Sequence, residues 1–188
     1  MKKLILSIAM LLLAAGCVRV PQGVEPVTGF EVERYLGTWY EIVRLDHSFE
    51  RGLQEVSATY TLMDDGRIEV VNRGYNPEKE EWKEAIGKAY FVDDPGTGRL
   101  KVSFWGPFYG AYNIIALDKK DYSYAMVCGP TRSYFWILAR KPVMPEPLKA
   151  ELITKAGKLG FETDELIHVT HSLTTSRFKR ERFSPASK

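Results

Sequence analysis

Most of the chain alternates between apolar and polar residues in short runs that are separated by turn residues. The first run begins at Gly37 and passes through Trp39 to Leu45. The later runs span residues 56–62, 68–73, 82–92, 100–105, 112–118, 122–128 and 134–140. A period of two residues predicts β-strands, and every connection after the first is short. The pattern predicts an all-β fold, an eight-stranded up-and-down antiparallel barrel, because closure removes the exposed edges of such a sheet.

One segment near the C-terminus has the periodicity of a helix. Between Pro145 and Gly160 the apolar residues recur at helical spacing, at Leu148, Leu152, Ile153, Ala156 and Leu159. A single apolar stripe indicates one buried face. We therefore expect one C-terminal helix packed on the outside of the barrel, followed by a short strand within residues 166–171.

Alternation also separates the residues that face the barrel interior from those that face solvent. In the first run Trp39, Glu41 and Val43 share the inner face, and Arg44 belongs to the outer one. On the other strands the less charged face carries Ala58, Tyr60, Val70, Asn72, Ala89, Phe91, Val102, Phe104, Tyr112, Ile114, Ala116, Ala125, Val127, Trp136 and Leu138. These residues could line a cavity for one small ligand. Taken alone they favour a filled barrel, since small barrels are often packed solid.

The N-terminus has the composition of a secretion signal. An apolar stretch from Leu4 to Ala15 follows a basic start and is too short to span a bilayer. It ends in Gly16-Cys17, which resembles the processing site of bacterial lipoproteins. We expect a signal peptide over residues 1–16, a lipid on Cys17 and a linker over residues 17–28. Ordinary signal cleavage nearby is the alternative.

Charge and cysteine content narrow the picture further. The chain carries 26 Lys and Arg against 24 Asp and Glu, and five of the basic residues lie from Arg177 onward. We expect residues 172–188 to be a basic, disordered tail on a slightly acidic domain, with no nucleic-acid partner. With Cys17 lipidated, Cys128 has no disulfide partner and is expected to pack as a small apolar side chain.

A series of motifs resembles the lipocalin family, and its bacterial lipid-anchored members in particular. The matching stretches are residues 34–42, 46–47, 49–52, 87–91, 101–104, 106–110, 128–130 and 136–140. They imply a lipocalin domain over residues 29–171. The resemblance also implies that Gly37 and Trp39 close one end of the barrel, with Arg140 packed across the indole ring.

The resemblance favours a cavity over a filled barrel. It implies fatty acids or lysophospholipids as ligands, with the acyl chain deep in the barrel and the head group at the open end. The expected ligand-binding residues are Tyr60, Asn72, Trp82, Phe91, Phe104, Tyr112 and Trp136. We expect residues 44–51 to cover part of the mouth as a lid. A turn is expected at residues 74–78, and the loops around the mouth would carry Tyr75, Asn76, Trp82, Phe108 and Tyr109.

Other functions find less support in the sequence. Motifs of serine hydrolases, zinc proteases and phosphate-binding loops do not occur, so we expect no enzyme and no cofactor. His168 and His171 would lie on opposite faces of a strand, which argues against a metal site, and His47 is expected at the surface. A buried Glu41 would have a structural role.

Two further hypotheses remain open at this point: a structural envelope lipoprotein with a filled barrel, and a carrier of another hydrophobic molecule. The resemblance implies attachment to the outer membrane, with the barrel facing the periplasm, and a homodimer as a candidate assembly.

Overall fold

The structure, a computed structural model, describes residues 18–172. The expected signal peptide and Cys17 lie outside the described residues, as does nearly all of the expected basic tail. Within residues 18–172, no helix has both the length and the hydrophobicity needed to cross a membrane.

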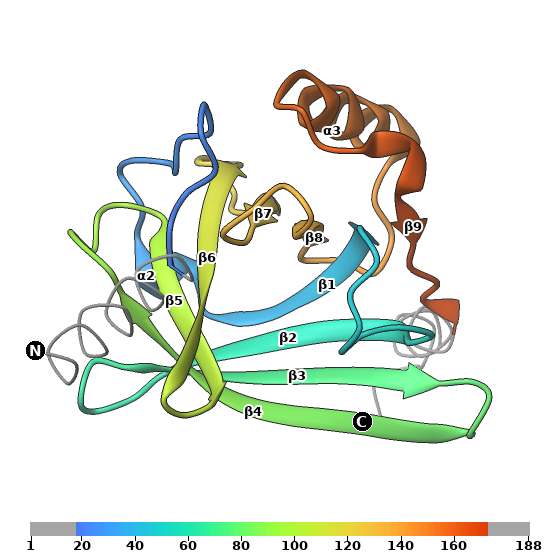
Figure 1. The fold of residues 1–188 in the computed structure, drawn as a ribbon, viewed down its shortest axis with the longest axis horizontal. Helices are drawn as coiled ribbons and strands as arrows, with labels where there is room; N and C mark the ends of the chain where they lie inside the picture. Colours follow the sequence, from blue (N-terminus) through green and yellow to red (C-terminus); the bar gives the residue numbers. More distant parts are fainter. Residues whose placement is uncertain (1–17, 173–188) are drawn as a thin grey trace, which may run out of the picture.

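Eight antiparallel strands form a closed up-and-down barrel, which confirms the predicted fold (Figure 1). In chain order they are β1 (Gly37–Arg44), β2 (Gln54–Leu62), β3 (Ile68–Asn76), β4 (Glu81–Phe91), β5 (Arg99–Trp105), β6 (Phe108–Leu117), β7 (Tyr124–Cys128) and β8 (Phe135–Ala139). Each strand pairs with the next one. The first strand also pairs with the last, so that β1 joins β2 to β8 and closes the sheet.

The hairpins on the open side reach further than the alternation predicted. β3 and β4 pair from Ile68 to Asn76, through the Gly74-Tyr75-Asn76 segment that was expected to be a turn. A side chain at Gly74 would meet Leu53 at 3.0 Å, so the glycine makes room for the neighbouring loop. The residues expected on loops at the mouth therefore lie in strands, namely Tyr75, Asn76, Trp82, Phe108 and Tyr109.

A β-bulge in β1 reverses the side-chain parity predicted for its second half. Glu41 pairs with Leu138, but Val43 pairs with Ile137, so the register shifts between them. Val43 consequently packs outside the barrel, and Arg44 lies opposite Trp136. The prediction for these two residues was wrong, because one extra residue in a strand moves all later side chains to the other face.

A second bulge, in β6, has the same effect on Ala116. The register shifts between Ile114 and Ala116, which pairs with Met126. Ile114 belongs to the core inside the barrel, whereas Ala116 and Met126 belong to the core outside it. Ala116 was therefore wrongly placed in the interior.

The outer core lies between the barrel and the helix α3 (Glu146–Lys158), as the helical periodicity predicted. Leu152 and Ala156 of this helix are buried against a cluster that includes Phe135 and Ile137. A short helical turn, η1 (Thr163–Glu165), leads from α3 to the strand β9 (Ile167–His168), which pairs with β1 on its outer side. Cys128 is fully buried, and burial raises the pKa of its thiol to about 12, so it packs as an inert side chain.

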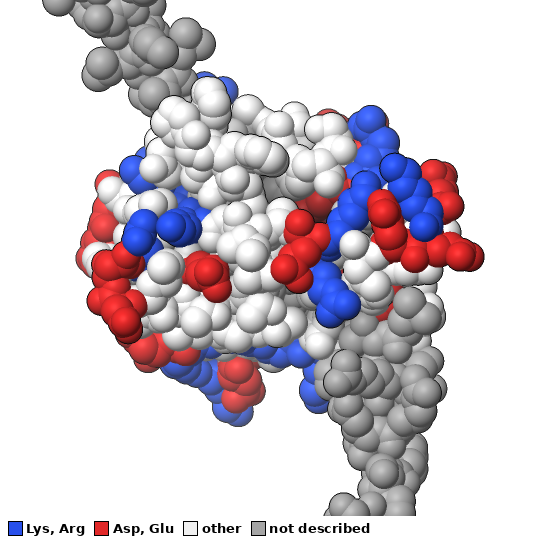
Figure 2. All heavy atoms as spheres, turned by 90° about the horizontal axis from the view of Figure 1, so that it is seen from below, with Lys and Arg blue, Asp and Glu red and all other residues white. Residues whose placement is uncertain are grey.

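The face seen in Figure 2 contains the β5–β6 hairpin, the lowest part of the described chain in Figure 1. Acidic and basic side chains border a largely uncharged central area on this face. Trp105 and Phe108, at the two ends of the hairpin turn, are 82% and 77% exposed.

Candidate functional site

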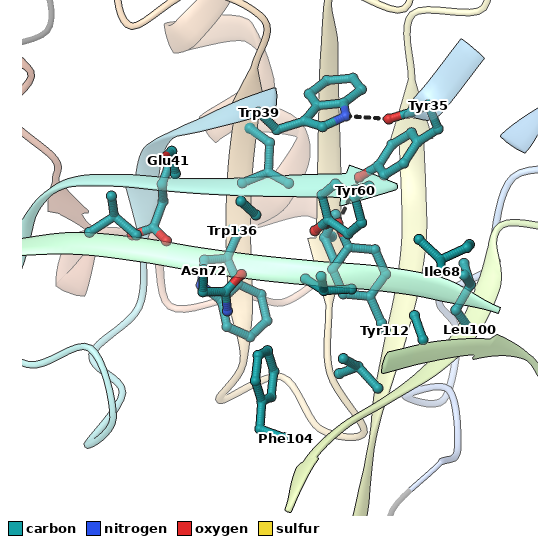
Figure 3. Close-up of a pocket in the computed structure, with 18 of the residues that line it drawn as sticks. Tyr35, Trp39, Glu41, Tyr60, Ile68, Asn72, Leu100, Phe104, Tyr112 and Trp136 are labelled. Atoms are coloured by element: carbon teal, nitrogen blue, oxygen red, sulfur yellow. Dashed lines mark hydrogen bonds between the residues drawn. The ribbon is translucent and has the colours of Figure 1, made fainter. Parts of the chain in front are cut away.

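The barrel encloses a cavity of about 120 Å³, the volume of roughly four water molecules in the liquid (Figure 3). Its wall is mostly aliphatic and aromatic, the usual lining of a site for a small apolar molecule. Five of the seven expected ligand-binding residues line it, namely Tyr60, Asn72, Phe104, Tyr112 and Trp136.

The other two, Trp82 and Phe91, are not part of the cavity wall. Trp82 is 43% exposed near the start of β4, where its ring lies 5.4 Å from that of Tyr75 and 4.1 Å from the guanidinium of Arg73. It lies in a strand rather than a loop, and its parity is opposite to that of the cavity-lining Ala89. Phe91 is partly buried against the inner core and packs edge-on against Phe30, which does line the cavity.

The closed end of the barrel is formed around Trp39, which has no exposed surface. A short helix, α2 (Val32–Tyr35), precedes β1, and the Tyr35 carbonyl accepts a hydrogen bond from the indole at 2.8 Å. The Arg140 guanidinium lies 4.0 Å from the centre of the indole ring and donates to the Thr38 carbonyl. Gly37 has a φ of +88°, and a side chain there would lie 3.5 Å from Arg140. This arrangement closes the barrel with a cation held by an aromatic ring and a carbonyl oxygen.

Three tyrosine hydroxyls lie directly above this plug and form a chain of hydrogen bonds. The Tyr112 hydroxyl lies 2.7 Å from that of Tyr35 and 2.8 Å from that of Tyr60. Burial raises the pKa of all three phenols, so each stays protonated and neutral. The floor of the cavity is therefore neutral, and its hydroxyl groups already have partners.

Charged side chains meet at the opposite end of the cavity. Arg44 is 1% exposed; its Nη1 donates to Glu41 Oε1 at 2.9 Å and its Nη2 to the Glu50 carbonyl at 3.0 Å. The Trp136 indole donates to Glu50 Oε2 at 3.1 Å. The bulge in β1 makes this cluster possible, because without it Glu41 and Arg44 would lie on opposite faces. Glu41 is buried, as expected, with Arg44 as its partner.

The cluster contains two buried carboxylates and one guanidinium. Burial raises the pKa of Glu41 well above its usual range, repulsion by Glu50 adds to the effect, and Arg44 opposes it. Burial also raises the pKa of Glu50, against the hydrogen bond from Trp136 and the charge of Arg44. Both carboxyl groups therefore bind a proton more readily than exposed glutamates do.

The connection between β1 and β2, residues 45–53, folds over this end of the barrel. His47 was expected at the surface, but it is only 3% exposed. Its ring stacks 5.4 Å from Phe49 and 5.2 Å from Tyr134. Burial and the nearby Arg44 lower the pKa of His47 to about 4, so the ring is neutral at pH 7. The prediction was wrong because it treated the loop as solvent-exposed, whereas the loop packs onto β8.

Two residues of this lid, Phe49 and Glu50, line the cavity. Phe49 is 61% exposed, so the lid end is where the cavity communicates with solvent. Three residues of the site were not predicted from the sequence, namely Tyr35, Arg44 and Glu50. An arginine between two apolar neighbours, Val43 and Leu45, was the one signal that pointed to Arg44.

Residues 18–172 contain no group of three or more metal-ligating side chains. His171 is buried, and its Nε2 lies 2.7 Å from the Glu41 carbonyl, where it supports the strand that carries the cluster. His168 lies in β9 and is exposed.

Comparison with known proteins gives concordant results. A family model described as a lipocalin-like domain matches residues 30–171. The outer membrane lipoprotein Blc of Citrobacter freundii is 54% identical over 86% of this chain and 90% of its own length. Apolipoprotein D of Mus musculus is 34% identical over 62% of this chain and 64% of its own length.

Among solved structures, the cockroach allergen Per a 4 has a similar fold. Its TM-score is 0.65 at 19% sequence identity, and the match covers 85% of this chain and 99% of that protein. At this level of identity the similarity supports the barrel fold alone.

Proposed function

We propose that this chain, which belongs to the lipocalin family, is an outer-membrane lipoprotein that binds a fatty acid or a lysophospholipid in its barrel. The observation that carries the proposal is the cavity: a pocket with an apolar wall and a neutral floor, with charged groups confined to the lid end. One acyl chain matches this distribution, since its tail is apolar throughout and its polar group lies at one end.

The two ends of the barrel give the ligand one direction. Trp39 and Arg140 close the floor, so a ligand would enter beneath the lid beside Phe49. The acyl chain would then contact Phe104, Tyr112 and Trp136, with its head group near Glu50. These residues are the ones we assign to ligand binding.

The expected lipid on Cys17 would anchor the domain through the linker of residues 17–28. Several acyl chains on one residue give stable attachment, which a single chain does not. Relatives named as outer membrane lipoproteins support this location, and we propose that the barrel faces the periplasm. The function would then be transport or storage of membrane lipid, or maintenance of the outer membrane. A homodimer belongs to the same proposal, and light scattering on the purified chain tests it.

Membership of the lipocalin family makes the chain a binding protein rather than an enzyme. A structural lipoprotein with a filled barrel is disfavoured by the cavity itself. A carrier of another hydrophobic molecule would use the same wall, so the experiment has to identify the ligand.

The protein purified from bacterial membranes is extracted with organic solvent, and the extract is analysed by mass spectrometry. The delipidated protein is then titrated with a lysophospholipid and with hexadecanoic acid while tryptophan fluorescence is recorded. Copurified single-chain lipid and saturable binding are expected. An extract without lipid, together with no response to either probe, would exclude the proposal, and copurification of a different apolar compound would identify another cargo.

A further inference from the structure

The charges that line the cavity all have one sign. Among the described residues of the wall, the only ionisable side chains besides tyrosine are Glu41 and Glu50. Figure 3 places Glu41 at one end of the cavity, with Ile68 and Leu100 at the other. A ligand in the barrel therefore meets carboxylate oxygens at the lid end and no cationic group in the wall.

Arg44 does not change this, because its guanidinium lies behind the two carboxylates. It is not part of the cavity wall, and its side chain is 1% exposed. Two of its nitrogens are bound, Nη1 by Glu41 and Nη2 by backbone carbonyls. Its Nε lies 3.9 Å from Glu50 Oε2 and has no hydrogen-bond partner among residues 18–172, but Arg44 is buried and does not line the cavity.

Two other arginines near the mouth, Arg51 and Arg73, are directed elsewhere. Arg51 is exposed and forms an ion pair with Asp46, and Arg73 lies over the ring of Trp82 on β4. Neither lines the cavity. Among the described residues no cationic side chain lines the cavity, so an anionic head group inside it would contact no cation in the wall.

The two carboxylates have hydrogen-bonding capacity that the cluster does not use. Glu41 accepts the Arg44 hydrogen bond through Oε1, while Oε2 makes none with any residue from 18 to 172. The cluster as a whole has two acidic groups and one basic group, so one positive charge would balance it. Aromatic rings of Phe49 and Trp136 also line this end, and such rings attract ammonium groups.

We propose that Glu41 and Glu50 form a head-group subsite that favours single-chain lipids carrying an ammonium group over those with a net negative head group, which bind more weakly. The inference rests on the proposed function, since it names the head group of the lipid that the cavity would hold. Like charges brought together in a water-poor site repel strongly, so the discrimination against the anionic lipid is expected to be about tenfold or more.

The test compares two lysophospholipids with the same acyl chain, one with an ethanolamine head group and one with a glycerol head group. Both are titrated into the delipidated protein, and affinity is measured by fluorescence or calorimetry. We expect the ethanolamine lipid to bind about ten times more tightly. Equal affinities, or tighter binding of the glycerol lipid, would overturn the subsite.

Two variants show whether the carboxylates cause the preference. Glu50→Gln keeps the side-chain shape and leaves Arg44 with Glu41 as a balanced pair, so the preference should fall to about twofold or less. Glu69→Gln, on the outward face of β3, is the matched control and should keep the full preference. A Glu50→Gln protein that retains it would overturn the assignment.

Glu41→Gln is the second test at the same site, and urea unfolding shows whether that variant is folded. If it does not fold, Glu50→Gln decides alone. Failure of the subsite and failure of the proposed function have different signatures. Binding of both lipids without preference removes the subsite only, whereas binding of neither removes the lipid-carrier proposal and the subsite with it.

Discussion

The two ends of the barrel each combine a tryptophan with an arginine, but they satisfy the arginine differently. At the closed end Arg140 lies over Trp39, and backbone carbonyls accept its hydrogen bonds. At the lid end Arg44 is 1% exposed and is held by Glu41, while Trp136 binds the second carboxylate, on Glu50. Arg140 needs no counter-charge, because it retains contact with solvent. Arg44 needs one, because it is buried.

This difference separates closure from recognition. At the closed end none of the described carboxylates lines the cavity, which meets neutral tyrosines there. The buried cluster at the lid end has two carboxylates and one guanidinium, and one of these carboxylates, Glu50, lies on the connection that packs over the mouth. A buried charge without its partner costs much more than a hydrogen bond lost near the surface, so the two ends should respond differently to the same substitution.

The largest expected effect follows from replacing each arginine with methionine. Arg44→Met leaves two buried carboxylates without a cation and should lower the free energy of unfolding by about 3–5 kcal/mol at pH 7. Arg140→Met leaves no unpaired charge and should lower it by about 1–2 kcal/mol. Urea unfolding measures both, with the exposed Arg51→Met as a control of near-zero effect.

The same pair of variants should differ in pH dependence. The pKa values of Glu41 and Glu50 are already raised in the folded protein, and loss of Arg44 raises them further. A carboxyl whose pKa is higher in the folded than in the unfolded state favours folding at low pH, and this contribution is lost as pH rises through the folded value. Arg44→Met should therefore regain stability between pH 7 and pH 5 relative to Arg140→Met. If the free energies of unfolding of the two variants depended on pH in the same way, the assignment of a charge imbalance to the lid end would be contradicted.

A smaller effect is expected at the wall between the two ends. Trp136→Ala removes an aromatic surface from the cavity and a hydrogen bond from Glu50, so affinity for lysophospholipid should fall about tenfold, or 1.4 kcal/mol. Trp82→Ala is the control, because Trp82 lies outside the cavity and should leave binding unchanged. An unchanged affinity of folded Trp136→Ala would remove this residue from the site.

The smallest effect concerns His47 in the lid. Burial lowers its pKa from 6.5 to about 4, so folding favours the neutral ring. Stability from this source is present above pH 6.5 and is lost as pH falls toward 4. When the pH is lowered from 7 to 5, the free energy of unfolding of His47→Phe should therefore fall by about 1 kcal/mol less than that of the unchanged protein, as measured by urea unfolding. The absence of this difference would place His47 in contact with water.

The sequence allowed the closed end to be predicted far better than the lid end. Strand number and order follow from alternation, which is a local property. Trp39 lies in β1, whose pairing with β2 is regular near the plug, and Arg140 follows directly after β8, so a linear motif identifies them. The tyrosine floor could be predicted only in part. Alternation gives Tyr60 and Tyr112 inward parity, but Tyr35 lies in a short helix that no periodicity predicted.

The lid end depends on features that alternation does not encode. The bulge in β1 moves Arg44 inward, and its position is set by pairing with β8, about a hundred residues later. Glu50 and His47 reach the interior through the fold of an irregular connection that has no period. Trp82 illustrates the same limit, since its orientation depended on how far β4 extends.

The central claim is that the barrel cavity is the place where lipid binds, and one pair of variants tests it directly. Ala58 and Thr61 both lie in β2, but only Ala58 lines the cavity. Ala58→Phe would occupy the space of the acyl chain, whereas Thr61→Phe adds the same ring to the outer face. Titration of both delipidated proteins with lysophosphatidylethanolamine should show affinity reduced at least about tenfold for Ala58→Phe. Thr61→Phe should bind as the unchanged protein does. Equal, undiminished binding by the two folded variants would contradict the account.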